Sequence, residues 1–154
     1  MILGSKTRYA VMAIVELSGY PEGSPVKLAD LAQAQEITVP YLEQIFSKLK
    51  QAGLVKSVRG PGGGYVLAKP ASQLRISEVV QAVEEPMKMT RCDKHTPAGC
   101  MTTGSRCMTH DLWEGLENHI FKYLNSITVA DVRKRELPIL PGADKILASG
   151  AQIN

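Results

Sequence analysis

The chain has 154 residues, of which 44% are hydrophobic and 21% are charged, as in a globular protein with a packed core. No apolar run reaches the roughly 18–20 residues of a membrane-spanning helix, and the seven-residue run at 9–15 lacks a following cleavage site, so we expect a cytoplasmic protein without a membrane segment. The net charge of +3 is uneven, because residues 1–75 carry nine Lys/Arg against five Asp/Glu. This surplus suits a polyanionic partner, although ordinary solubilising charge explains it equally well.

The first helix and the following loop are marked by capping residues and by prolines. Ser5 or Thr7 is expected to cap a helix that runs to about Gly19 and carries an apolar stripe on one face. Pro21 and the residues up to Pro25 then predict a loop.

Two short helices joined near residues 36–38 form a candidate helix–turn–helix. The second is bounded by Thr38 as its N-cap and by Gly53 just past its end. Pro40 falls in its first turn, where the missing N–H has no intrahelical partner to lose. The apolar residues expected to pack the two helices across each other are Leu28, Leu31, Ala32, Ile37, Leu42, Ile45 and Leu49.

The outward side of the second helix carries groups that can meet DNA in the major groove. Gln44 can pair with adenine, Tyr41 and Ser47 can reach phosphates, and Glu43 can accept from cytosine N4 and disfavour other sites. An ordinary pair of packed helices explains the same pattern. The DNA-binding residues predicted from this segment are Thr38, Pro40, Tyr41, Glu43, Gln44, Ser47 and Lys48.

After this helix the apolar residues recur at every second position, which predicts strands at Leu54–Arg59 and Tyr65–Leu67. The residues between them, 60–64, are predicted to form a hairpin tip. A hairpin after a helix–turn–helix is typical of a winged helix, and its glycines let backbone N–H groups approach phosphates. A nucleotide-binding loop is excluded, because no Gly-Lys-Ser/Thr is present and a strand follows. A flexible turn without a ligand stays an alternative. The wing residues expected at DNA are Arg59, Gly60, Gly62 and Gly63.

The second half is expected to hold a short helix from Ser77 to Glu85, a polar loop, and a longer helix over residues 109–126. The fold class is therefore mainly α with a small β-hairpin wing, a winged helix–turn–helix domain with a long C-terminal dimerisation helix. The expected divisions are residues 1–86, 87–108, 109–136 and a flexible tail at 137–154. A stripe on the long helix is predicted to form a dimer interface, with intramolecular core as the alternative: Trp113, Leu116, Ile120, Tyr123 and Leu124.

Three cysteines and a histidine follow the pattern Cys92-x7-Cys100-x6-Cys107-x2-His110. Cys107 and His110 are three residues apart at the start of the long helix, so they can share a face and chelate one metal. Thiolates with an imidazole suit an iron–sulphur cluster or zinc, and the wide gaps favour the cluster. A zinc site, a thiol redox switch and inert cysteines stay open, whereas a nucleophilic enzyme lacks an oxyanion pocket.

Longer motifs resemble the IscR-type regulators of iron–sulphur cluster assembly, within the winged-helix superfamily that includes the NsrR and CymR types. The resemblance runs from Met1 to about Glu136 and is carried by five segments: Ser5–Ala10, Tyr41–Ser47, Ser57–Tyr65, Thr90–Cys92 and Cys107–Trp113. The histidine in the last segment is absent from NsrR-like relatives.

The resemblance implies a homodimer on a pseudo-palindromic double-stranded DNA operator, with a [2Fe–2S] cluster per subunit. It implies Cys92, Cys100, Cys107 and His110 as ligands. It also implies that cluster occupancy changes which promoters are bound, commonly repressing cluster-assembly genes, and that the protein is not an enzyme.

Overall fold

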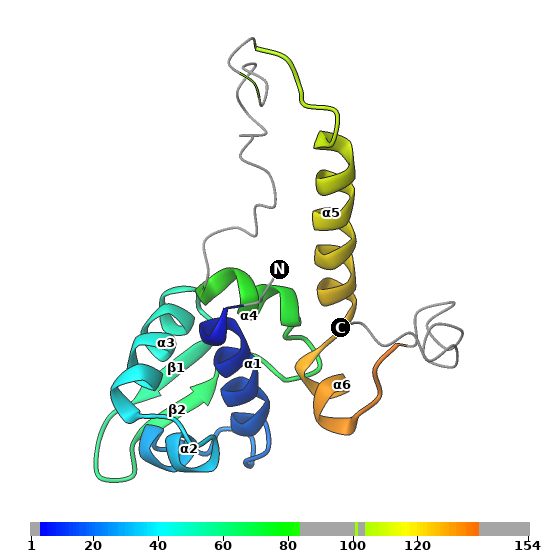
Figure 1. Cartoon of the computed structure of the whole chain (residues 1–154). Coiled ribbons are helices and arrows are strands. Elements are labelled where there is room, and N and C mark those ends of the chain that lie inside the picture. The colour runs from blue at the N-terminus through cyan, green and yellow to red at the C-terminus, as the bar shows by residue number, and fades with distance from the viewer. Residues whose placement is uncertain (1–3, 84–100, 102–103, 139–154) are drawn as a thin grey trace.

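The computed structural model describes residues 4–83, 101 and 104–138. Helices α1 to α4, the hairpin and α6 form one packed body, and α5 projects away from it (Figure 1). The predicted fold class, mainly helical with a two-stranded wing, is confirmed. The elements in chain order are α1 (Ser5–Leu17), α2 (Leu28–Ala34), α3 (Val39–Gln51), β1 (Val55–Val58), β2 (Gly64–Leu67), α4 (Ile76–Val83), α5 (His110–Ser126) and α6 (Val129–Lys134).

The core lies where α1, α3 and α4 meet. Ile14, Phe46 and Val79 are fully buried there, one from each helix. Burying a side chain of this size contributes about 1.5–3 kcal/mol, so this contact fixes the mutual placement of the three helices. The ring of Phe46 also meets that of Tyr65 edge-on, with centroids 4.9 Å apart, and this contact fastens the hairpin to α3.

The start of α1 differs from the expectation. Gly4 is the N-cap, so Ser5 and Thr7 lie inside the first turn and neither caps the helix. Thr7 is 3% exposed and faces the core. The helix starts before both residues, so the prediction that Ser5 or Thr7 caps α1 is wrong.

Both ends of α3 were correctly located by the sequence. Thr38 is the N-cap, although its side chain makes no capping hydrogen bond. At the other end Gly53 has φ +72°, a conformation that glycine adopts without strain. The N–H of Leu54 donates to the carbonyl of Leu49 at 2.9 Å and that of Gly53 to Lys50 at 3.0 Å, which is the Schellman arrangement. This tight stop turns the chain directly into β1.

The wing is an antiparallel hairpin in which Val55 pairs with Leu67 and Val58 with Gly64. Val26, before α2, forms a further bridge to Tyr65. The sequence analysis placed Gly64 in the hairpin tip, but in the structure Gly64 is the first residue of β2. A Cβ at this position would lie 2.3 Å from the Val26 carbonyl oxygen, so only glycine allows the bridge.

The residues that follow the C-terminal end of α5 are hydrogen-bonded to the packed body. The N–H of Ile76 donates to the carbonyl of Ile127 at 3.0 Å, and that of Val129 to Leu74 at 2.9 Å. The guanidinium of Arg133 on α6 donates to the carbonyl of Ser18 at the end of α1. These contacts return the chain to the packed body after α5.

Several predicted features lie outside the described residues: the helix end at residues 84–86, most of the loop at 87–108, and the tail from residue 139 on. Among the described helices, none is both long enough and apolar enough to pass through a bilayer.

Candidate DNA interface and metal centre

The outer face of α3 presents the polar groups that the sequence selected. Glu43, Gln44 and Ser47 are exposed, while Leu42 and Ile45 on the opposite side are fully buried. Thr38 and Pro40 are exposed at the start of the helix. A helix held by one buried face with a polar face free is the geometry that enters a major groove.

Two other predicted contacts of α3 are engaged within the protein. Tyr41 is half-buried, and its ring meets that of Tyr9 edge-on with centroids 5.8 Å apart. Lys48 is also half-buried, and its Nζ donates to the carbonyl oxygen of Val83 at 3.2 Å. Its ammonium therefore lies at the end of α4.

At the hairpin tip, Arg59, Gly60 and Gly62 are exposed and Gly63 is half-buried. The N–H of Gly63 donates to the carbonyl of Gly60 at 2.9 Å, which closes the turn. Gly60 has φ +114°, so this turn requires a glycine there.

A contact that the sequence analysis missed links α3 to the wing. Nζ of Lys50 donates to Oγ of Ser57 on β1 at 2.8 Å. No sequence signal indicated this pair. Arg59 on the hairpin is exposed as well, so Lys50 and Arg59 add positive charge that suits a phosphate backbone.

Two of the four predicted metal ligands, Cys107 and His110, lie at the N-terminal end of α5. His110 is the first residue of the helix and is 7% exposed. Its N–H donates to the carbonyl oxygen of Cys107 at 3.1 Å, so one turn of chain holds both residues. Sγ of Cys107, which is half-buried, lies 3.7 Å from Oγ1 of Thr109. Cys92 and Cys100 lie outside the described residues.

Acidic groups flank His110 that the sequence analysis did not select. Oε2 of Glu114 lies 3.7 Å from Nε2 of His110, one helical turn on. Asp111 belongs to the same group, whose potential ligand atoms all lie within 4.8 Å of one another. The spacing of four residues between His110 and Glu114 could have indicated their contact.

The described donors fit an iron–sulphur cluster in their chemistry. A thiolate and an imidazole are ligands that such clusters accept.

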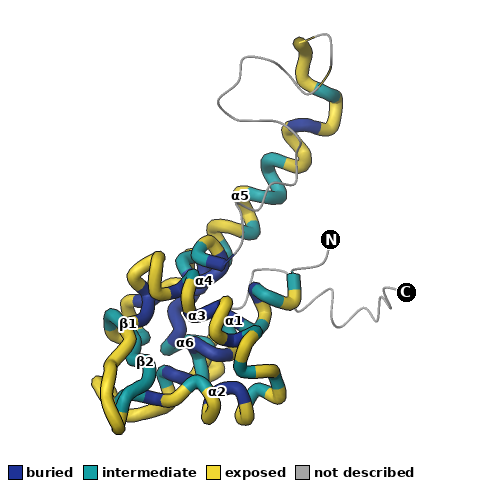
Figure 2. Tube along the Cα trace, turned by 90° about the vertical axis from the view of Figure 1, so that its left-hand side faces the viewer, coloured by how far each residue is buried: buried dark blue, intermediate teal, exposed yellow. Residues whose placement is uncertain are grey.

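The shaft of α5 carries the stripe predicted for dimerisation. Trp113 is 42% exposed, and Leu116, Ile120, Tyr123 and Leu124 are half-buried. Along α5, His110 is the sole buried residue, and exposed and partly exposed positions continue along the shaft (Figure 2). Tyr123 and Leu124 pack against the core of the same chain, so the apolar surface left for a partner lies at Trp113, Leu116 and Ile120. Apolar surface on a projecting helix is typical of an interface.

Comparison with known proteins settles the class of the chain. The profile of the Rrf2 family, described as "Iron-dependent Transcriptional regulator", matches residues 3–135. The chain belongs to the Rrf2 family. It is therefore a transcriptional regulator that binds DNA, and its relatives are named as regulators and not as enzymes.

Relatives of this Rrf2 regulator confirm the resemblance to the IscR type. The HTH-type transcriptional regulator IscR of Vibrio atlanticus is 48% identical over 134 residues, which cover 87% of this chain and 76% of that protein. IscR of Yersinia pseudotuberculosis is 46% identical over 145 residues, covering 94% and 86%.

Solved structures of regulators named IscR and CymR have a similar fold. The structure of T. potens IscR matches with a TM-score of 0.72 at 32% identity over 88% of each chain. CymR, the global cysteine regulator of B. subtilis, matches with a TM-score of 0.71 at 28% identity over 88% of this chain and 98% of its own.

Proposed function

We propose that this Rrf2 regulator binds a [2Fe–2S] cluster in each subunit of a homodimer and controls genes of iron–sulphur cluster assembly. Its ligands would be Cys92, Cys100, Cys107 and His110. The observation that carries the proposal is the placement of Cys107 and His110 on one turn of chain at the head of α5, in a protein 46–48% identical to regulators named IscR.

The surroundings of His110 support its part as a ligand. Its ring is buried, which limits its motion and shields a bound group from water. Oε2 of Glu114 lies 3.7 Å from Nε2 of His110, and a carboxylate beside the ring is the usual outer partner of a metal-bound histidine. When bound, the cluster would supply a signal of iron and sulphide availability.

The position of α5 relates the ligands to DNA. Two copies joined along Trp113, Leu116, Ile120, Tyr123 and Leu124 would present two α3 helices to one duplex. Half-sites about 34 Å apart would then form a pseudo-palindromic operator. The contacts would come from the outer face of α3 and from the tip around Arg59.

The regulatory effect requires little free energy. A change of roughly 10- to 100-fold in operator affinity corresponds to about 1.4–2.7 kcal/mol of differential binding. Ligation at residues 107 and 110 would act on the head of α5, and the last turn of this helix carries Asn125, which is hydrogen-bonded to Ser77 of the DNA-binding body.

Visible absorption of anaerobically purified protein tests the proposal, with iron and acid-labile sulphide measured on the same sample. We expect coloured protein with two irons and two sulphides per chain, as the composition of a [2Fe–2S] cluster requires. His110→Ala should lose the charge-transfer bands. His119→Ala is the matched control, because His119 is exposed on the same helix with Nδ1 2.9 Å from its own Gly115 carbonyl.

Three results would contradict the proposal. A colourless protein with one zinc per chain would favour the zinc alternative. Reversible thiol oxidation without metal would favour the redox switch. Equal occupancy in both histidine variants would exclude His110 as a ligand.

A further inference from the structure

The turn between α2 and α3 holds a glutamate in an unusual backbone conformation. Glu36 has φ +53°, and within the described part of the chain Arg135 is the one other non-glycine residue with a positive φ. The N–H of Ile37 donates to the carbonyl of Ala32 at 3.0 Å, and that of Glu36 to the carbonyl of Gln33 at 3.3 Å. This is the Schellman arrangement, whose left-handed residue is usually glycine. A glutamate there lowers stability, because its Cβ crowds the following carbonyl oxygen.

The side chain of Glu36 does not contribute to this turn. Glu36 is exposed, and its carboxylate has no hydrogen bond or ion pair with any residue in the described ranges 4–83 and 104–138. By contrast, the amide of the neighbouring Gln35 donates to Oε2 of Glu16 at 3.5 Å. The negative charge of Glu36 therefore faces solvent, and its effect falls on whatever approaches the turn.

The turn lies next to the part of the chain that is predicted to enter the major groove. Glu36 precedes Thr38, the N-cap of α3, by two residues, and Thr38 and Pro40 are exposed at the start of that helix. In a helix–turn–helix the second helix meets base edges with its N-terminal residues while the first crosses the sugar–phosphate backbone. The turn between them then lies beside that backbone, where a carboxylate repels phosphate and offsets the partial positive charge at the start of α3.

We propose that Glu36 limits the affinity of this regulator for DNA of any sequence, because its carboxylate opposes a phosphate beside the turn. The repulsion involves the backbone and not the bases, so it acts on operator and unrelated duplex alike. Glu43, which is predicted to face base edges, would instead discriminate among sequences. The inference rests on the proposed docking of α3 on DNA, which Gln44→Ala tests separately.

Four substitutions separate the charge of Glu36 from its backbone strain. Glu36→Gln removes the charge and keeps the left-handed Cβ, whereas Glu36→Gly removes both. Arg135→Gly relieves the same kind of strain just past the end of α6, which lies across the packed body from α3 (Figure 1). Glu136→Gln removes an exposed carboxylate from that distant end, so it is the matched control for charge.

Fluorescence anisotropy over a salt series measures binding of the full-length proteins to two probes. One is the duplex that the wild type selects from a random-sequence pool, and the other is a scrambled duplex of the same composition. We expect Glu36→Gln and Glu36→Gly to bind both probes roughly 3- to 10-fold more tightly, with a salt slope steeper by up to about one unit. Glu136→Gln should bind both probes as the wild type does.

Urea denaturation of the same proteins measures the strain. The urea midpoint should rise by roughly 0.5 M in Glu36→Gly and in Arg135→Gly, and it should stay unchanged in Glu36→Gln. Tighter DNA binding without added stability in Glu36→Gln would then assign the effect on DNA to the carboxylate.

Three results would overturn the inference. Weaker binding of the selected duplex by Glu36→Gln would make the carboxylate a favourable contact. Equal tightening in Glu136→Gln would reduce the effect to net charge. Unchanged binding of both probes by Glu36→Gln would place the turn away from phosphate, provided that Gln44→Ala weakens binding of the selected duplex. If Gln44→Ala also binds as the wild type does, the docking of α3 fails, and the inference with it.

Discussion

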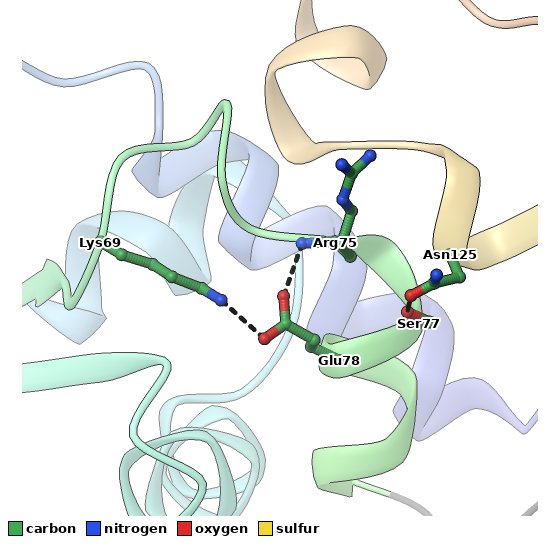
Figure 3. A network of polar contacts seen from close by, with 5 residues as sticks. All are labelled: Lys69, Arg75, Ser77, Glu78 and Asn125. Atoms are coloured by element: carbon green, nitrogen blue, oxygen red, sulfur yellow. Dashed lines mark hydrogen bonds and ion pairs between the residues drawn. The ribbon is translucent and has the colours of Figure 1, made fainter.

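The hydroxyl of Ser77 donates to Oδ1 of Asn125 at 2.8 Å, and this bond joins the first turn of α4 to the last turn of α5 (Figure 3). Ser77 is 2% exposed, so the bond lies at the edge of the core. Beside it, a guanidinium nitrogen of Arg75 donates to the carbonyl of Ser126 at 3.4 Å. The helix that carries His110 at its far end is therefore anchored to the DNA-binding body by side chains as well as by backbone.

Removing the Ser77 hydroxyl is expected to weaken this anchor. Ser77→Ala should lower the free energy of unfolding by about 1 kcal/mol, the usual contribution of one such hydrogen bond. Urea denaturation followed by circular dichroism measures it. Ser126→Ala is the control, because the Ser126 hydroxyl is exposed and donates to the carbonyl of Tyr123 in its own helix at 2.7 Å. Its loss should stay below about 0.5 kcal/mol, and equal losses would exclude a special part for Ser77.

Glu78, in the same region, predicts a dependence of stability on acid. Burial by itself raises the pKa of Glu78, but the hydrogen bonds from Lys69 and from the backbone N–H of Arg75, with the charges of both residues, outweigh it. The folded pKa therefore lies below its ordinary value. Such a carboxylate stabilises the fold above its unfolded pKa, and the contribution is lost as the pH falls through the folded pKa.

Urea midpoints measured from about pH 6 down to pH 3 test this dependence. The wild type should lose more stability over that range than Glu78→Gln. The difference should be less than about 1 kcal/mol, because the side chain is 34% exposed and solvent screens the pair. Lys69→Met, which removes the partner at 2.6 Å, should also flatten the profile. Superimposable profiles for all three proteins would show that the ion pair contributes nothing.

Most of the elements could be predicted because the spacing of apolar residues and the positions of glycine, proline and capping residues indicate the same boundaries. Gly53 marks the end of α3 since a left-handed residue is needed there, and Thr38 marks its start. The hairpin follows from alternating residues around a glycine tip. These features are local, so each can be inferred from a few neighbouring residues.

The features that the sequence did not indicate depend on tertiary contacts. The sequence places Lys48 on a helix with polar and apolar faces, but it does not show that the ammonium is hydrogen-bonded to the carbonyl of Val83 in α4. Gly64 looks like another tip glycine until the Val26 carbonyl is placed against it. Glu114 becomes relevant only once His110 is known to be buried beside it. At the candidate metal centre the sequence indicated the donor types, and the structure added the acidic neighbours.

The cap of α6 should matter more than the cap of α3. Oγ1 of Thr128 accepts from the N–H of Asp131 at 3.1 Å, and the carboxylate of Asp131 accepts from the N–H of Thr128 at 2.8 Å. Thr128→Ala should therefore cost about 1 kcal/mol of unfolding free energy, and Thr128→Ser should recover most of it. Thr38→Ala is the matched control, because the Thr38 side chain makes no capping bond. If both alanine variants lose the same stability in urea, the reciprocal cap is not the cause.

The dimer proposal predicts a large effect from one residue of α5. Trp113→Glu places a charge in the predicted interface and should raise the dissociation constant of the dimer by roughly 30-fold or more, as for an aromatic hot spot. Asn118→Glu introduces the same charge on the same helix, about 140° around from Trp113, and should leave the dimer intact. Sedimentation velocity over a concentration series measures both. A wild-type protein that stays monomeric at high concentration would remove the interface altogether.

Two glycines at the wing tip, Gly62 and Gly63, differ in whether the fold requires glycine at their position. A Cβ on Gly63 would lie 2.4 Å from the Val58 carbonyl oxygen and 2.9 Å from that of Gly60, both backbone atoms that cannot turn aside. A Cβ on Gly62 would meet nothing within 4 Å, and no positive φ constrains this residue. Folding thus requires glycine at position 63 but not at position 62.

Gly63→Ala should lower the free energy of unfolding by about 1–3 kcal/mol, because the turn must deform to admit the methyl group. Gly62→Ala should fold at least as stably as the wild type, since alanine reduces the freedom of the unfolded chain. If the tip approaches phosphates through its bare backbone, the methyl group of Gly62→Ala should weaken operator binding by roughly tenfold, a cost of about 1.4 kcal/mol. Urea denaturation and fluorescence anisotropy at one fixed salt concentration measure the two effects on the same preparations. Wild-type affinity in Gly62→Ala would place residue 62 outside the DNA interface, and wild-type stability in Gly63→Ala would contradict the turn geometry.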